Sequence, residues 1–185
     1  MNVRQKWLIL PAALFAAFAF TGAAPAQYDY YRSDEAAKTW SVHAGAAFFR
    51  NRPALKDRTN LIVGVEGERP VGAAGAGSEG RVTLSADYIP LRTVAEGTVS
   101  IVPVLIGYKA YTPMGGYRAF FGASIGTRWA GDDVPALRIR KGFRFGWGGG
   151  AGVNISPDLL AQVRFLAGEH PSDDGAWTVE LGYRF

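Results

Sequence analysis

Apolar and polar residues alternate with a period of two along most of this chain, and this alternation constrains the fold more than any other feature. The last segment of the chain shows it over its whole length. One set of alternate positions holds Trp177, Val179, Leu181, Tyr183 and Phe185, and the other holds Thr178, Glu180, Gly182 and Arg184. Successive side chains of a β-strand point to opposite faces, so this segment is predicted to be a strand with one apolar and one polar face.

About eight segments follow this rule, and Gly, Pro, Asp and Asn residues separate them. They lie near residues 40–48, 61–66, 81–90, 98–111, 117–129, 143–154, 161–165 and 177–185. The segment 98–111 is apolar on both faces at its centre, so the pattern does not assign its faces. Apolar residues at helical spacing are almost absent after the first part of the chain. The fold is therefore predicted to be all-β, with an even number of strands.

The connections between these segments also alternate in length. Residues 112–116 and 155–158 are short turns, whereas residues 49–60, 130–141 and 168–175 are long and charged. Short turns at one end and long polar loops at the other are typical of transmembrane barrels. Residues 68–80 are an exception, because a long stretch lies where a short turn is expected. Either the second strand is longer than its alternation indicates, or this turn departs from the rule.

Two kinds of closed barrel fit these strands: a soluble barrel turns the apolar face inward, and a membrane barrel turns it outward. The aromatic residues lie toward the ends of the strands, which favours the interfacial girdles of a membrane barrel. A row of glycines at 146, 148, 150 and 152 shares the face that carries arginines. Inside a narrow lumen such a row leaves space for long side chains, whereas on a solvent face it would only weaken the strand. We therefore predict an eight-stranded, antiparallel, up-and-down transmembrane β-barrel.

The first residues predict export. Arg4 and Lys6 precede an apolar run from Trp7 to Phe20, and small residues follow before Gln27. This is the pattern of a cleavable signal peptide at residues 1–26. Residues 27–39 are then a polar periplasmic lead-in, and residues 40–185 form the barrel.

The composition of the remaining chain excludes several kinds of chemistry. There is no Cys, which excludes a disulfide framework, a thiol nucleophile and a thiolate metal site. Without the leader, 18 Lys and Arg residues face 16 Asp and Glu residues, a balance that gives no indication of nucleic-acid binding.

The polar faces of the strands place many charged residues inside the predicted barrel. Buried charges are costly unless they are paired, so we expect a salt-bridged interior that plugs the lumen. The alternative is a narrow water-filled pore with unpaired charges. The predicted network consists of Glu66, Asp87, Arg118, Arg128, Arg144, Arg164, Glu180 and Arg184.

With these residues identified, the chain resembles the small eight-stranded outer-membrane barrels of Gram-negative bacteria. That family of porin-like barrels contains the opacity proteins and the membrane domain of outer-membrane protein A. The resemblance covers residues 40–185 and is carried by VPVLIGYKAY (102–111), YRAFFGASIGTRW (117–129), GWGGGAGVNISPDLLAQVRF (146–165) and the ending ELGYRF. It implies an outer-membrane location and a C-terminal insertion signal at Tyr183 and Phe185, which the barrel-assembly machinery reads. The long segment at 68–80 departs from the family pattern.

Two histidines are candidate sites of chemistry. Ser41 and His43 share a strand face and would meet Glu66 or Asp87 on neighbouring strands, which is an arrangement for an activated nucleophile. Outer-membrane acylhydrolases hold such residues on the lipid side, whereas these face the lumen, so a hydrogen-bonded interior histidine is expected instead. His170 precedes Asp173 and Asp174 in a loop, where solvation is favoured over cation binding. We predict no catalytic residue, metal or cofactor.

The loops carry a second group of charges. The connection at residues 49–60 holds Arg50, Arg52, Lys56 and Arg58, and the connection at residues 130–141 holds Arg138, Arg140 and Lys141. If these loops face outward, the side chains would pair with the phosphates of lipopolysaccharide. The alternative, to which the sequence gives at least equal weight, is that they are simply solvated. The expected function is non-enzymatic: a barrel that anchors extracellular loops for envelope integrity, surface interaction or adhesion. The alternatives are a narrow channel for ions or small apolar solutes and, less favoured, a lipid A-modifying enzyme.

Overall fold

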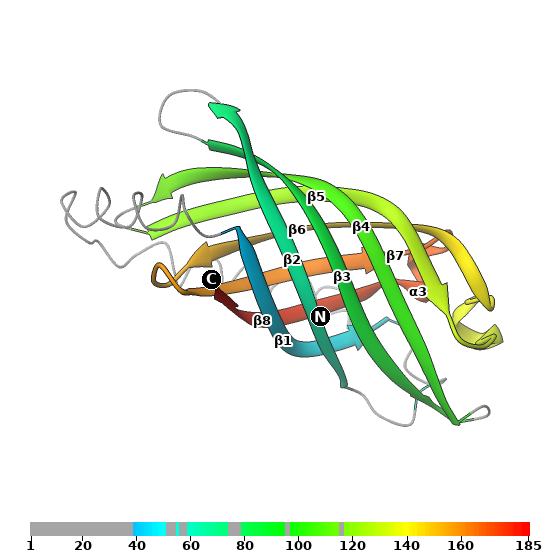
Figure 1. Ribbon diagram of the computed structural model, residues 1–185. Helices are drawn as coiled ribbons and strands as arrows, with labels where there is room; N and C mark the ends of the chain where they lie inside the picture. Colours follow the sequence, from blue (N-terminus) through cyan, green and yellow to red (C-terminus); the bar gives the residue numbers. More distant parts are fainter. Residues whose placement is uncertain (1–38, 51–54, 56–58, 74–78, 95–96, 115–116) are drawn as a thin grey trace, which may run out of the picture.

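The computed structural model describes residues 39–50, 55, 59–73, 79–94, 97–114 and 117–185. Eight strands form a closed antiparallel barrel in which each strand pairs with its neighbours in sequence (Figure 1). The strands are β1 (Trp40–Phe49), β2 (Asn60–Ala73), β3 (Glu79–Thr93), β4 (Gly97–Met114), β5 (Tyr117–Ala130), β6 (Gly142–Asn154), β7 (Leu159–Ala167) and β8 (Ala176–Arg184). The predicted eight-stranded up-and-down barrel is confirmed. The signal peptide and residues 27–38 lie outside the described residues.

Two short helices lie in the connections at one end of the barrel. They are η3 (Pro135–Leu137), between β5 and β6, and α3 (Pro171–Asp174), between β7 and β8. We call this end the loop end, and the opposite end, where β1 begins and β8 finishes, the terminal end (Figure 1). No helix among the described residues has the length and apolarity needed to span a bilayer.

Pairing of the first and last strands closes the barrel. The register runs from Ser41 opposite Arg184 to Phe49 opposite Ala176. At the terminal end, the Phe185 N–H donates to the Trp40 carbonyl at 2.9 Å, and the Trp40 N–H donates to the Phe185 carbonyl at 3.3 Å. The last residue of the chain is thus part of the ladder that closes the sheet.

The long stretch at residues 68–80 is explained by the length of β2. This strand continues to Ala73, and β3 begins at Glu79, so only residues 74–78 connect them. A register shift between Pro70 and Gly72 marks a bulge near the end of β2. Of the two alternatives, the longer second strand is confirmed.

The outer surface of the barrel is apolar along every strand. Large apolar side chains are exposed there, and most charged residues of the same strands are buried, which is the inverse of a soluble barrel; Arg69, Arg92 and Arg144 are exposed. The exposed residues include Trp40, Leu61, Leu84, Ile106, Phe121, Ile125, Phe143, Phe145, Leu181 and Tyr183. In β1, β3 and β8 the apolar set of alternate positions lies outward and the polar set inward, as the alternation predicts, and β5 follows the same rule except at Ala119, which is buried. This surface is suited to contact with lipid. Of the two kinds of barrel that fit the sequence, the chain therefore forms the membrane barrel.

The faces of β4, which the sequence did not assign, are distinct in the structure. Val104 and Ile106 point outward, whereas Ile101 and Leu105 are buried in the interior. This strand is apolar on both faces because the interior itself is apolar at the loop end. The interior therefore has two parts, a mainly apolar part at the loop end and a charged part nearer the terminal end.

Candidate functional site: the charged lumen

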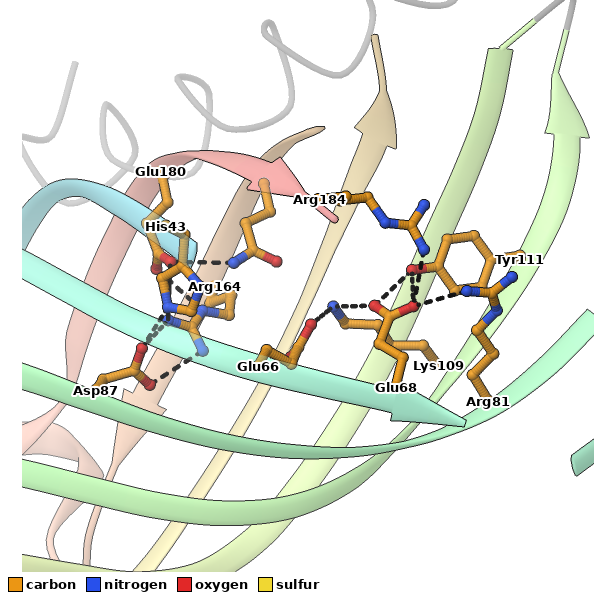
Figure 2. Close-up of polar contacts among 11 residues, drawn as sticks. His43, Glu66, Glu68, Arg81, Asp87, Lys109, Tyr111, Arg164, Glu180 and Arg184 are labelled. Carbon is orange, nitrogen blue, oxygen red and sulfur yellow. Dashed lines mark hydrogen bonds and ion pairs between the residues drawn. The ribbon is translucent and has the colours of Figure 1, made fainter. Parts of the chain in front are cut away.

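The charged part of the lumen consists of two groups of polar side chains, one beyond the other along the barrel (Figure 2). The first, here called the His43 network, contains His43, Asp87, Gln162, Arg164, Thr178 and Glu180. The second, the Glu68 network, lies toward the terminal end and contains Glu66, Glu68, Glu79, Arg81, Lys109, Tyr111, Arg118 and Arg184.

Arg164 is the centre of the His43 network. Its Nη1 and Nη2 atoms donate to Asp87 Oδ2 and Oδ1 at 3.1 and 2.8 Å. Its Nε and Nη2 atoms donate to Glu180 Oε1 and Oε2 at 2.9 and 2.8 Å. One guanidinium thus joins two carboxylates in paired, charge-assisted hydrogen bonds, the strongest geometry available to this side chain. β7 supplies the arginine, and β3 and β8 supply the acids, so the network ties distant strands together.

His43 hydrogen-bonds within the same network. Its Nε2 atom lies 2.6 Å from Asp87 Oδ1 and 3.4 Å from Glu180 Oε2. These three side chains have the composition of a metal-binding set. However, Arg164 Nη2 lies 3.2 Å from His43 Nε2 and also contacts both carboxylates. The guanidinium holds the place that a cation would need, so the geometry supports an ion-pair cluster and not a metal centre.

Glu68 is the centre of the second network. Its carboxylate accepts hydrogen bonds from Tyr111 Oη at 2.7 and 2.8 Å, and it pairs with Lys109, Arg81 and Arg184, each at 3.2 Å. Lys109 also pairs with Glu66, which lies toward the His43 network. These contacts satisfy a buried carboxylate from several strands at once.

The Tyr111 ring organises the cations at the terminal end. The guanidinium carbons of Arg81 and Arg118 lie 5.1 and 4.8 Å from the ring centroid, within the range of cation–π attraction. Both arginines also pair with Glu79, whose side chain is partly exposed. The terminal end of the lumen is therefore filled by stacked and paired side chains.

The interior charges balance one for one among the described residues. The cations are Arg81, Lys109, Arg118, Arg128, Arg164 and Arg184, and the anions are Glu66, Glu68, Glu79, Asp87, Asp174 and Glu180. The pair formed by Arg128 and Asp174, at 2.8 Å, lies at the loop end, where Asp174 also accepts from the Gly168 N–H. An interior with no net formal charge avoids the large cost of burying unpaired ions.

Glycines make room for these networks. A Cβ atom on Gly150 would lie 2.9 Å from Arg164 Cγ, and one on Gly64 would lie 2.2 Å from Asp87 Oδ1. On Gly152 it would lie 2.4 Å from the Phe120 ring. The space predicted beside the interior arginines is therefore present in the structure.

Most of the predicted network residues lie where the sequence placed them. Glu66, Asp87, Arg118, Arg128, Arg164, Glu180 and Arg184 are buried in the interior. Arg144 is not: its side chain is exposed. In the alternation, Arg144 falls on the same face as the buried Gly146. However, β6 begins at Gly142, so Arg144 lies at the loop-end rim, where even an inward-facing side chain reaches solvent. The prediction that Arg144 belongs to the lumen network is wrong.

Several network residues were missed by the sequence reasoning. Glu68 fell in the stretch whose strand boundary was uncertain, and Lys109 and Tyr111 lie on the strand whose faces were not assigned. Arg81 lies in the predicted strand segment 81–90, on the same face as Asp87, but the predicted network does not include it. The sequence did contain a signal for these residues: each lies an even number of positions from an inward-facing residue on the same strand, and therefore shares its face.

The loop residues remain separate from the lumen networks. Arg50, Arg138, Arg140 and Lys141 are exposed, and Arg138 pairs with Asp173 at 3.3 Å. Arg52, Lys56 and Arg58 lie outside the described residues. His170 is exposed just before α3, whereas Asp174 is buried against Arg128. The loop histidine and its nearby acids therefore do not converge on a common cation position.

Solved structures share this architecture. The crystal structure of the outer membrane enzyme PagL aligns with 79% of this chain and 97% of its own, with a TM-score of 0.54 and 14% identity. The chain has the fold of a small outer-membrane barrel. Yersinia pestis Ail in a nanodisc (TM-score 0.46, 12% identity, 80% and 99% covered) and Pseudomonas aeruginosa OprG (0.42, 11%, 80% and 96%) are further matches. No protein-family model and no curated protein sequence matches the chain.

Proposed function

We propose that the protein is a non-enzymatic outer-membrane barrel that anchors extracellular loops, in envelope integrity, surface interaction or adhesion. The observation that carries this proposal is the filled interior: ion pairs occupy one part of the lumen and apolar side chains the other. A barrel that is plugged along its axis is suited to holding loops in place. The apolar outer surface and the fold of the matching structures support an outer-membrane location, with the loop end facing outward.

The channel alternative rests on the segment 98–111, which is apolar on both faces and forms most of β4. The inner face of this strand is covered by other side chains of the lumen, which supports a closed barrel over a route for solutes. Recording from planar bilayers tests this directly. We expect no reproducible conductance steps from the refolded protein, and regular steps would overturn the proposal in favour of the channel.

The enzyme alternative would require reactive side chains near lipid. The chain contains two histidines, and His43 is buried in the lumen while His170 lies in a loop. The similarity to PagL, at 14% identity, is a likeness of fold. We therefore expect identical lipid A mass spectra from cells with and without the gene. A change in acyl chains that depends on the protein would contradict the non-enzymatic proposal.

Two partners follow from the proposed location. The exposed loop cations Arg50, Arg138, Arg140 and Lys141 are placed to pair with phosphates of lipopolysaccharide. Replacing Arg138, Arg140 and Lys141 together by Gln should weaken retention of lipopolysaccharide during purification, and unchanged retention would remove this partner. The barrel-assembly machinery is the second partner, acting through Tyr183 and Phe185, whose side chains are exposed at the terminal end.

A further inference from the structure

The apolar part of the lumen forms a continuous layer at the loop end, here called the apolar plug. Strands β1 to β5, β7 and β8 contribute to it, together with residues of the connections. Its members are Ala47, Phe49, Leu55, Ile62, Ile89, Leu91, Val99, Ile101, Leu105, Ala130, Val134, Leu137, Ile139, Leu166 and Ala176. On β6, Gly146 and Gly148 face the same region, and the side chain of Leu166 lies beside Gly148.

Residues of the connections form the outer side of this plug. Leu137 and Ile139, both in the connection between β5 and β6, are almost completely buried. Leu55 bridges to Thr93 at the end of β3. The connection between β7 and β8 is fixed by Asp174, which accepts from Arg128 at 2.8 Å and from the Gly168 N–H at 3.1 Å. The plug is therefore held between the strands and the connections above them.

The charged part of the lumen has room for water. A cavity of about 30 Å³ lies between the two networks, lined among others by Glu66, Lys109, Gln162 and Arg164. Gln162 donates through Nε2 to Glu180 Oε2 at 3.0 Å, which fixes the orientation of its amide. Its Oε1 atom is buried and has no hydrogen-bond partner. The lining of this cavity is part polar and part apolar, and with an unsatisfied acceptor it has room for a water molecule, which needs at least about 10–15 Å³.

The apolar plug offers no comparable space. The cavity beside it measures about 10 Å³. Its lining is mainly apolar, with Phe49, Ile89, Ile101 and Leu105 among its members, and it also includes the Arg128–Asp174 ion pair. Arg128 and Asp174 are paired with each other, so water entering this space would find few hydrogen-bond partners, and an ion would gain little in return for its lost hydration shell. Hydrophobic constrictions in channels close by this exclusion of water.

We propose that the apolar plug, and not the ion-pair networks, is the barrier that closes the lumen to ions. This inference rests on the proposed function in that it takes the unaltered barrel to be closed. The networks hold the strands together around a hydrated space, whereas the plug provides the dry section. The two parts of the lumen thus have separate roles, stability for one and insulation for the other.

Bilayer recording of two matched double variants tests this division. Ile89 and Ile101 are direct register partners within the plug, and replacing both by Ser introduces hydroxyls without charge. Glu66→Gln with Lys109→Gln removes an ion pair of the other part without leaving an unpaired charge. We expect the Ser variant to exceed the Gln variant in conductance by about tenfold or more, because wetting of the plug opens the path.

The outcomes separate the inference from the proposed function. The conductance of the unaltered protein tests whether the barrel is closed. The ratio of the two variants' conductances tests which part of the lumen is the barrier to ions, and a Gln variant that conducts as well as or better than the Ser variant would overturn the inference. Heat-dependent gel migration of each variant shows whether it has folded.

Cysteine accessibility provides a second measurement that needs no polar residue in the plug. The chain contains no Cys, so a single introduced thiol reports on its own position. Thr83 lines the cavity between the networks, and Ile101 lies in the plug. In the folded protein, silver ions should block the thiol of Thr83→Cys and leave that of Ile101→Cys free for labelling after denaturation. Equal or reversed protection would show that the plug is not the dry section.

Discussion

Arg164 and Asp87 lie 77 positions apart in the sequence, yet two guanidinium nitrogens of Arg164 donate to the two carboxylate oxygens of Asp87 at 3.1 and 2.8 Å. The residues belong to β7 and β3, which are not neighbours in the sheet. Their contact therefore crosses the lumen. It also shows how a barrel without disulfides fixes its cross-section, because a strand displaced from its place would lose this pairing.

Replacing Arg164 by Met should destabilise the barrel strongly. The substitution would leave Asp87 and Glu180 as buried carboxylates without their main partner, which typically costs about 3–5 kcal/mol. Urea titration in detergent micelles measures the free energy of unfolding. The control is Arg138→Gln, which removes an exposed pair with Asp173 and should cost no more than about 1 kcal/mol. Equal effects of the two changes would show that the buried network does not stabilise the fold.

Adjacent glycines on β6 should respond differently to alanine. A Cβ atom on Gly150 would lie 2.4 Å from the Val163 carbonyl and 2.9 Å from Arg164 Cγ, whereas on Gly149 the nearest atom would be 3.4 Å away. Gly150→Ala should therefore destabilise by about 1–3 kcal/mol through overpacking. Gly149→Ala faces lipid and should change the free energy of unfolding by no more than about 0.5 kcal/mol. The same urea titration compares them, and a tolerated Gly150→Ala would mean that the lumen is looser than the structure indicates.

The strand pattern predicted the fold well because it depends on a strong, local rule. Each residue of β8 has the burial that its parity requires, and the same holds for the central part of β3. Parity alone, however, says which face a side chain is on and not where along the lumen it lies. Arg144 has inward parity but is exposed at the rim, and this distinction depends on where β6 begins relative to its neighbours.

The partners inside the lumen were less accessible from the sequence. Tyr111 and Glu68 are 43 positions apart and are joined by the stagger of the strands around the barrel. The apolar plug was also not predicted, although the segment 98–111 contained its signal as apolar residues on both faces. That observation indicated an unusual interior, and only the closed barrel shows that the inner residues of β4 meet apolar residues of other strands.

An arginine introduced on the outer face should destabilise the barrel strongly at the centre of the barrel wall and only slightly at its rim. Ile125 is exposed in the middle of β5, and Phe143 is exposed near the start of β6. Ile125→Arg should cost about 2–4 kcal/mol in liposomes, and Phe143→Arg about 0–1 kcal/mol, because the penalty for charge decreases from the midplane to the interface. Folding titrations into liposomes give both values. Similar small penalties at the two sites would contradict a lipid-facing outer surface.

Phe185→Ala should separate assembly in the cell from folding in the test tube. The backbone of Phe185 pairs with Trp40 and closes the barrel, and alanine can make the same two hydrogen bonds. The Phe185 side chain is exposed and lies outside the lumen networks, so its loss should leave refolding in detergent nearly unchanged. If the assembly machinery reads this ring, the variant should instead accumulate less in the outer membrane, measured as the fraction with heat-modifiable migration in membrane extracts.

A variant that refolds poorly in detergent would assign the Phe185 ring a structural role, and normal levels in membranes would remove the insertion signal. Thr178→Ala, on the inward face of the same strand, is the matched control, because it loses a hydrogen bond to Glu180 and should lower stability without a specific defect in assembly.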